Sequence, residues 1–217
     1  MAEASAEIET LEAAGFPEAS VKQFLKSPSP LFFGVFLLAD WREKAAYRPL
    51  ARVMRFPWVS HDKMLGEPAL EEPGYRIIVA VFDGDPKFIF DIILDLDANS
   101  SVRFWQWHAL TLLALEGKLD RAVAADFARK AFVEMARDAV DLLVWAGREK
   151  LIARLALTDL APLVRKAHDA ELLVESTYEE FQEDLEYAIA HPNARCRPGD
   201  ELEAFAGVRE LESWVES

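Results

Sequence analysis

The sequence predicts an all-α protein, an irregular α-α superhelix in which antiparallel helix pairs stack within a single domain over residues 1–217. Three observations predict this class. Ala, Leu and Glu dominate the chain, and all three favour helix. Apolar residues recur at spacings of three and four in most segments. The chain has only nine glycines and few polar clusters, which indicates few long loops and therefore antiparallel neighbours.

The N-terminal quarter of the chain is expected to hold helices at about 5–14, 17–26, 30–41 and 42–56. The last of these is the clearest, because apolar and basic residues form two interleaved stripes along it. Its apolar face holds Tyr47, Leu50, Ala51 and Met54, and the other face holds a basic stripe of Lys44, Arg48, Arg52 and Arg55. Three prolines make residues 57–73 an irregular connection.

The next segment fits two structures, because two β-branched runs flank Asp83-Gly84 in the manner of a β-hairpin. We favour a helical hairpin. Pro86 would remove a backbone donor at the start of a second strand, whereas Asp85 and Pro86 suit the cap and first turn of a helix. Three charged residues at fourfold spacing also align on a helix but on no strand face, and they are Lys87, Asp91 and Asp95.

Cap residues divide the second half of the chain into further helices. The helix at about 101–116 is apolar nearly all round, which is typical of the middle of a stack. The cap of this helix is expected among residues 99–101. Later helices are expected to begin at Asp120, Asp138, Thr158 and Ser176 or Thr177. One more helix is expected in the tail, at about 200–214. No strict repeat is visible. The pattern suits a HEAT-like stack, whose concave face favours binding, or else a compact helical bundle.

The net charge of −14 is concentrated at the two ends of the chain. Residues 1–20 carry five acids and no base, and residues 169–217 carry fourteen acids and three bases. Residues 21–168 carry nineteen acids and twenty-one bases. The pI near 4.8 argues against wholesale nucleic-acid or anionic-membrane binding, but it describes the near-neutral centre poorly. We hypothesise that the acidic ends, including the helix and tail at 176–217, fold back over the basic stripe.

The chain is predicted to be a soluble cytoplasmic protein. Its single cysteine, Cys196, excludes an intramolecular disulfide. The acidic first residues lack the basic start and apolar run of a secretory signal. The longest apolar run, at 31–39, has nine residues, whereas a membrane span needs about 20.

Three local patterns carry a family resemblance. They are an Arg-Glu-Lys-x-x-Tyr run, an Asp-Gly-Asp turn and a Val-Arg pair, formed by Arg42, Glu43, Lys44, Tyr47, Asp83, Gly84, Asp85, Val102 and Arg103. With them, segments 36–50 and 75–117 resemble a bacterial family, domain-of-unknown-function family 1186, and the likeness covers about residues 20–190. The resemblance implies HEAT-like helices and no catalytic residue. Some relatives carry a cysteine-rich zinc motif, but this chain has only Cys196, so no zinc is implied.

No catalytic, cofactor-binding or metal-binding residue is predicted, and the chain is expected not to be an enzyme. None of the four histidines lies at zinc-ligand spacing from another histidine or from Cys196. Nucleotide-binding and nucleophile motifs are also missing from the sequence. We interpret Asp83 and Asp85 as turn and cap residues, the acidic run at 179–186 as a solvated helix face, and Cys196 between two arginines as an incidental loop residue.

Two groups of residues are candidates for binding. The basic stripe could hold an acidic partner or a phosphate, pair with the acidic terminal helices, or simply be solvated. The helix with Trp105, Trp107 and His108 could line a ligand groove, or place His108 beside a carboxylate in an enzyme, although core packing alone also explains it. We expect first an interaction module for another protein, second a small-molecule site or enzyme near this helix, and more weakly anion or nucleic-acid binding. No cofactor is expected.

Overall fold

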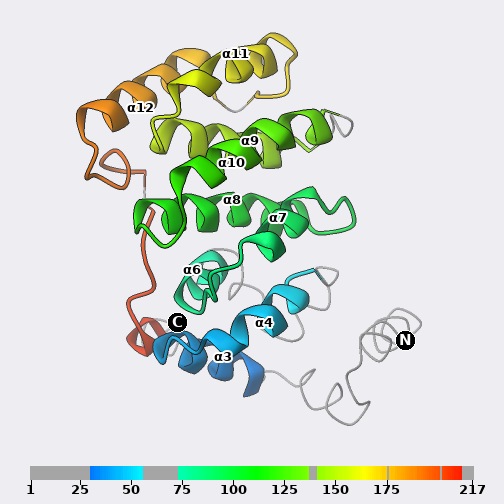
Figure 1. Ribbon diagram of the computed structural model, residues 1–217, viewed down its shortest axis with the longest axis vertical. Coiled ribbons are helices and arrows are strands. Elements are labelled where there is room, and N and C mark those ends of the chain that lie inside the picture. The colour runs from blue at the N-terminus through cyan, green and yellow to red at the C-terminus, as the bar shows by residue number, and fades with distance from the viewer. Residues whose placement is uncertain (1–29, 56–72, 137–140, 175, 201, 212–217) are drawn as a thin grey trace.

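The structure is a computed structural model that describes residues 30–55, 73–136, 141–174, 176–200 and 202–211. This part of the chain contains helices and no strand, which confirms the all-α prediction. Figure 1 shows the helices stacked in layers, from α3 and α4 at one end to α11 and α12 at the other. The α-helices are α3 (Pro30–Asp40), α4 (Tyr47–Val53), α6 (Pro73–Ala80), α7 (Lys87–Leu94), α8 (Ser100–Leu115), α9 (Arg121–Met135), α10 (Leu142–Arg154), α11 (Ala161–Asp169) and α12 (Tyr178–Ala190).

Helix α8 occupies the middle of the stack and packs against α6, α7, α9 and α10. This is the place that its nearly all-round apolar sequence predicts, and eleven of its residues are buried. Helix α10 approaches it closely at Gly147, where an added Cβ would lie 2.7 Å from Cδ1 of Trp107. Only glycine therefore allows the observed spacing of α8 and α10.

The helical hairpin predicted around Asp83-Gly84 is confirmed by α6 and α7. The Asp83 carboxylate accepts a hydrogen bond of 2.9 Å from the N–H of Asp85. Asp85 in turn accepts one of 3.0 Å from the N–H of Lys87. The helix begins at Lys87 with Pro86 at its N-cap position, one residue later than predicted. Gly84 has a φ of 106°, which the turn needs and which a side chain would disfavour.

Most helix starts follow the predicted caps. Asn99 accepts from the N–H of Ser101 at 2.8 Å, Asp120 accepts from Ala122 at 2.8 Å, and Thr177 forms a capping box with Glu180. The start expected at Asp138 lies outside the described residues. In the described part, α10 begins after Asp141, whose side chain accepts from the N–H of Val144.

The predicted helix at 42–56 is wrong in its extent. The chain forms a short 3-10 helix, Lys44–Ala46, and then α4, which ends at Val53. Pro49 is the reason, because a proline inside an α-helix lacks its N–H and clashes with the carbonyl four residues earlier. Starting the α-helix at Tyr47 keeps Pro49 in the first turn, where a proline is tolerated.

Four helices end in the same left-handed turn, in which the N–H groups of two residues past the helix bond back to its last carbonyls. In α3, for example, the N–H of Glu43 donates to Leu38 at 2.9 Å and that of Arg42 to Ala39 at 3.1 Å. The left-handed residues that end α3, α8, α10 and α11 are Arg42, Gly117, Ala156 and Glu171. Only Gly117 signals its turn in the sequence.

The segment after α12 is a strap, described over residues 197–200 and 202–211, that runs along the side of the stack from α12 to α3 (Figure 1). The helix expected at about 200–214 is wrong in the described residues, because 202–207 have no helical structure and only Val208–Leu211 form a 3-10 turn. Leu202 and Phe205 are buried against the stack. The strap contacts four layers through Arg197–Asp184, Asp200–Arg154, Glu203–Tyr75 and Phe205–Phe36.

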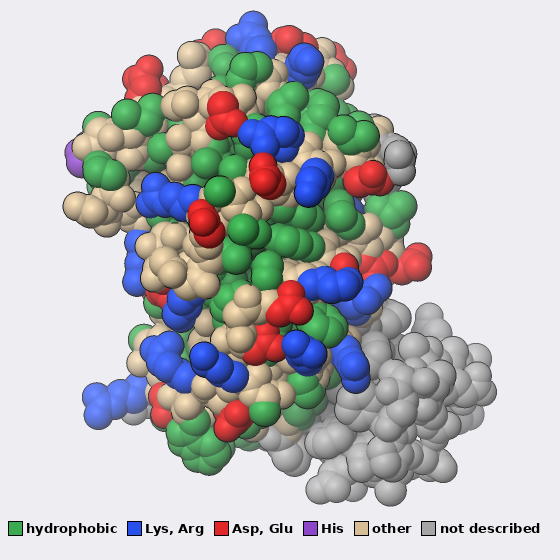
Figure 2. Space-filling model, viewed as in Figure 1, with side chains coloured by type: hydrophobic (Ala, Val, Ile, Leu, Met, Phe, Trp, Pro, Cys, Tyr) green, Lys and Arg blue, Asp and Glu red, His purple; other side chains and the backbone are tan. Residues whose placement is uncertain are grey.

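Charged side chains are not spread evenly over the surface. Figure 2 shows Lys and Arg gathered on the lower part of the visible face, at the end of the stack that holds α3 and α4. No helix among the described residues has both the length and the apolar character needed to cross a bilayer.

Candidate functional site

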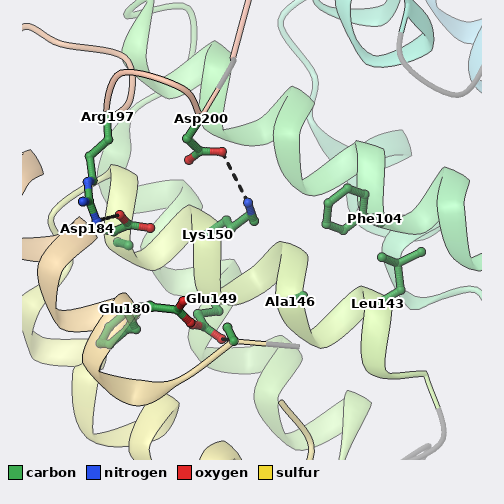
Figure 3. Close-up of a pocket in the computed structure, with 12 residues that line it drawn as sticks. Phe104, Leu143, Ala146, Glu149, Lys150, Glu180, Asp184, Arg197 and Asp200 are labelled. Carbon is green, nitrogen blue, oxygen red and sulfur yellow. Dashed lines mark hydrogen bonds and ion pairs between the residues drawn. The ribbon is translucent and has the colours of Figure 1, made fainter. Parts of the chain in front are cut away.

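A cavity of about 530 Å³ opens between α8, α10, α12 and the strap. This volume lies in the range of small-molecule sites. Figure 3 shows charged side chains on one side of the cavity, with Phe104 and Leu143 on the other. The lining residues are Phe104, Leu143, Ala146, Glu149, Lys150, Ala153, Ser176, Glu180, Phe181, Asp184, Arg197 and Asp200. The cavity therefore offers an apolar surface and several carboxylates to one ligand.

Glu149 is the most unusual of these groups. It lies within α10 and is only 6% exposed. Its Oε2 accepts a hydrogen bond of 3.0 Å from the hydroxyl of Ser176. Burial raises the pKa of Glu149 to about 7, because the charged form loses its hydration. Near neutral pH the carboxyl group can therefore be charged or neutral, depending on what lies beside it.

His168 of α11 approaches the same carboxylate. Its Nε2 lies 3.6 Å from Oε2 of Glu149, which is too long for a hydrogen bond. This nitrogen is buried and has no hydrogen-bond partner in the part of the chain that the structure describes. Burial lowers the pKa of His168, so the imidazole is neutral near pH 7 and does not neutralise Glu149.

Asp200, on the strap, is held by two cations of α10. Its carboxylate lies 2.7 Å from Nη2 of Arg154 and 3.3 Å from Nζ of Lys150. Burial alone would raise the pKa of Asp200, but the hydrogen bonds and charges of Arg154 and Lys150 outweigh that effect and lower it. Asp200 is thus ionised and already paired.

The two remaining carboxylates of the cavity are also engaged. Asp184 lies 3.0 Å from Nη1 of Arg197, and Glu180 accepts a hydrogen bond of 2.7 Å from the N–H of Thr177. Among the described residues, Glu149 has no Lys or Arg within ion-pair distance. Of the four carboxylates that line the cavity, Glu149 alone has neither a cationic nor a backbone partner among the described residues.

The basic stripe is not a free basic patch. Nε of Arg48 lies 2.9 Å from Asp83, and Nε of Arg55 lies 2.7 Å from Asp95. Arg52 and Lys44 are exposed and have no ion pair with any described residue. Two of its four members are therefore paired, but with Asp83 and Asp95 and not with the acidic terminal helices, as the alternative had it.

Among the described residues, the acids that pair with the stripe come from the middle of the chain, and the acidic tail at 212–217 lies outside the described residues. Helix α12, which carries the acidic run, lies at the end of the stack opposite α4 (Figure 1). The hypothesis that this helix folds over the stripe is wrong, because Asp83 and Asp95, at the two ends of the α7 segment, occupy that position. The N-terminal acidic segment lies outside the described residues.

The aromatic side chains of α8 mostly serve packing. Trp107 is fully buried, its ring centroid lies 5.3 Å from that of Phe127, and it does not line the cavity. Trp105 is partly buried and stacks on Tyr75 at 5.4 Å. Phe104, a neighbour of Trp105 on the same helix, lines the cavity.

His108 is enclosed by rings, with centroids of Phe104, Trp105 and Tyr75 at 4.6, 5.0 and 5.7 Å. Its hydrogen-bond contact among described residues is with the carbonyl of Phe104, not with a carboxylate. Burial, followed by the charge of Arg154, lowers its pKa to about 3. The described residues therefore do not place an Asp or Glu beside His108, as the predicted enzyme pocket requires. His108 also does not line the cavity.

The arginines beside Cys196 are both engaged in ion pairs, Arg195 with Glu116 and Arg197 with Asp184. Within the described residues, no group of three His, Cys, Asp or Glu side chains is placed to hold a metal ion.

A family model described as "Protein of unknown function (DUF1186)" matches residues 9–216. The chain belongs to this family. The match spans nearly the whole chain, and it confirms the resemblance found in the local patterns. No curated protein and no solved structure matches the chain.

Sequence reasoning missed Glu149, the buried carboxylate of this cavity. Arg148, Glu149 and Lys150 are three consecutive charges within an apolar helix, and at 100° per residue they point in different directions. At least one of them had to face inward, and this signal was available. The solvated acidic face predicted on α12 holds for Glu180, which is exposed although it lines the cavity, whereas Asp184 is half-buried there.

Proposed function

We propose that this chain is a helical binding module whose cavity holds a ligand with an apolar body and a cationic head. Glu149 is the observation that carries the proposal. It is a buried carboxylate that lines the cavity and has no cationic partner among the described residues. A charge in such a place costs much less free energy when an opposite charge binds beside it.

The surroundings of Glu149 define the rest of the ligand. Ser176 donates to Oε2, whereas Oε1 accepts no hydrogen bond from any described residue. Phe104, Leu143 and Phe181 supply apolar surface across the cavity. A suitable ligand has an ammonium or guanidinium group that binds the Glu149 carboxylate and an apolar stem that contacts the surface around Phe104.

Two sources could supply such a group. A small organic amine is one, and a Lys or Arg side chain of a partner protein is the other. The second source agrees with the protein partner expected from the sequence, and neither source requires catalysis. The volume of the cavity favours the small amine, because a single side chain from a protein would fill only part of it.

Isothermal titration calorimetry with three probes tests the proposal. Phenethylamine has the proposed head and body, phenethyl alcohol lacks the charge, and a capped Ala-Lys-Ala peptide represents a protein side chain. We expect phenethylamine to bind about tenfold or more tightly than the alcohol at a pH above the pKa of Glu149. Tighter binding of the peptide than of the amine would assign the site to a protein partner.

The matched variants are Glu149→Gln, which keeps the shape but not the charge, and Glu186→Gln, which removes an exposed charge from α12 outside the cavity. Glu149→Gln should abolish the preference for the amine over the alcohol, and Glu186→Gln should keep it. The proposal fails if both variants bind phenethylamine like the unmodified protein. Thermal unfolding of each variant verifies that the fold is intact.

A further inference from the structure

A second, smaller pocket lies at the other end of the stack. It has a volume of about 330 Å³ and lies where the ends of α3 and α6 meet the segment after α8. Its lining residues are Arg42, Lys44, Val79, Ala80, Phe82, Gly84 and Lys118. Three of them are cations that come from two separate parts of the chain, and no carboxylate is among them.

Only one of these cations is satisfied within the described residues. Nζ of Lys118 lies 3.3 Å from the carbonyl of Val79 and 2.9 Å from Glu116, so it caps the end of α6 and is held in place. Arg42 and Lys44 are exposed, and neither forms an ion pair or hydrogen bond from its side chain with any described residue. The pocket therefore concentrates positive charge that the described chain does not neutralise.

We propose that this pocket binds the phosphate group of a small phosphate monoester. The planar guanidinium of Arg42 suits bidentate bonding to two phosphate oxygens, and Lys44 adds a point charge. Lys118, which is already paired with Glu116, contributes an ammonium group to the wall of the pocket. Val79, Ala80 and Phe82 give the pocket an apolar part that contacts the organic group of the ester. This site is independent of the cavity at Glu149.

The surrounding surface favours a compact anion over a nucleic acid. A polyanion is held by a continuous row of cations that neutralise successive phosphates. Here the row is interrupted, because Arg48 and Arg55 are paired with Asp83 and Asp95. Of the two stripe cations without an ion pair to a described residue, Lys44 lies in the pocket beside Arg42 and Arg52 lies outside it, so they do not form a track.

Titration of the intact protein with phenyl phosphate, inorganic phosphate and a short oligothymidine tests this site by calorimetry at low salt. We expect phenyl phosphate to bind, and to bind more tightly than inorganic phosphate. The oligothymidine should bind more weakly than phenyl phosphate. Equal binding of the two phosphates overturns the assignment to an ester, and tight, salt-sensitive oligothymidine binding overturns the assignment to a small molecule.

Arg42→Gly is the informative variant. Arg42 has a φ of 52° in the turn that ends α3, a conformation that glycine adopts without strain, so the variant loses the guanidinium and keeps the fold. We expect Arg42→Gly and Lys44→Gln each to weaken phenyl phosphate binding about tenfold. Arg52→Gln removes one exposed charge of the basic stripe outside the pocket and should leave the affinity unchanged.

Two results would contradict the proposal. One is unchanged phenyl phosphate affinity in both Arg42→Gly and Lys44→Gln, which would reduce these cations to solvated surface groups. The other is an equal loss in Arg52→Gln, which would make the binding a diffuse property of the stripe. Glu149→Gln should not affect phenyl phosphate binding. The proposal for the phosphate pocket and the proposal for the cavity at Glu149 can therefore be disproved independently of each other.

Discussion

The two pockets of this molecule hold charge in opposite ways. In the cavity between α8, α10 and α12, a carboxylate is buried and its protonation depends on the protein around it. In the pocket between α3 and α6, Arg42 and Lys44 are exposed, and their charge is permanent but screened by water and salt. A buried charge is therefore sensitive to pH and to packing, whereas an exposed cluster is sensitive to ionic strength.

The largest expected effect concerns the pH dependence of stability. Because the pKa of Glu149 is about 7 in the folded chain and near its ordinary value in the unfolded chain, the folded chain holds more protons between these values. Glu149 therefore contributes stability below its unfolded pKa, and this contribution is lost as pH rises through the folded pKa. Glu149→Gln should become more stable than the unmodified protein above pH 7, by about 3 kcal/mol.

Urea unfolding of both proteins across a pH series measures this difference. His108 acts in the opposite direction: its pKa, lowered by burial to about 3, makes stability fall as pH drops below the ordinary histidine value. Comparison of the unmodified protein with Glu149→Gln cancels that contribution, because His108 is present in both. A difference that does not change with pH would contradict the assigned burial of Glu149.

The next effect concerns the packing that shapes the cavity. Gly147→Ala places a Cβ against Trp107 and should destabilise the fold by about 1–3 kcal/mol through overpacking of α8 on α10. Gly34→Ala in α3 is the matched control, since an added Cβ there meets nothing within 4 Å. It should stabilise the protein by about 0.5–1 kcal/mol, as alanine does inside a helix.

Thermal unfolding distinguishes these two variants by the sign of the change in midpoint. The pocket at Arg42 should bind phenyl phosphate equally in both, because neither substitution touches it. Gly147→Ala with full stability and unchanged amine binding would show that the spacing of α8 and α10 does not control the cavity.

The smallest expected effect is the response to salt. Raising ionic strength from about 0.05 to about 0.5 M should weaken phenyl phosphate binding several-fold, because the cations are exposed. Phenethylamine binding should change less, because its partner carboxylate is buried. Parallel titrations of the two ligands at both salt concentrations measure the contrast, and equal salt dependence would mean that the two pockets do not differ in this way.

Much of the helical architecture was readable from local sequence. The helical hairpin around Asp83 and Gly84 and the caps at Asn99, Asp120 and Thr177 depend on residues that are neighbours in the chain. The extent of α4 was also readable, since Pro49 excludes an earlier start, but the amphipathic pattern of 42–56 obscured it. The HEAT-like superhelical winding stays a prediction.

The candidate sites were less predictable, because the residues that form them are distant in sequence. The basic stripe is a true feature of the sequence, yet only its tertiary neighbours Asp83 and Asp95 decide that Arg48 and Arg55 are not free. Arg42 was noticed only as part of a local pattern. Its place beside Lys118 depends on the packing of the end of α3 against the segment after α8.

The sequence by itself determined that the chain is helical, where most helices begin, and that α8 belongs at the centre. Those properties follow from spacing, caps and apolar content, which act over a few residues. Tertiary structure alone decided which charges are buried, paired or free. A carboxylate such as Glu149 has an ordinary pKa in an extended chain, and its raised pKa arises when α10, α11 and α12 remove the water around it.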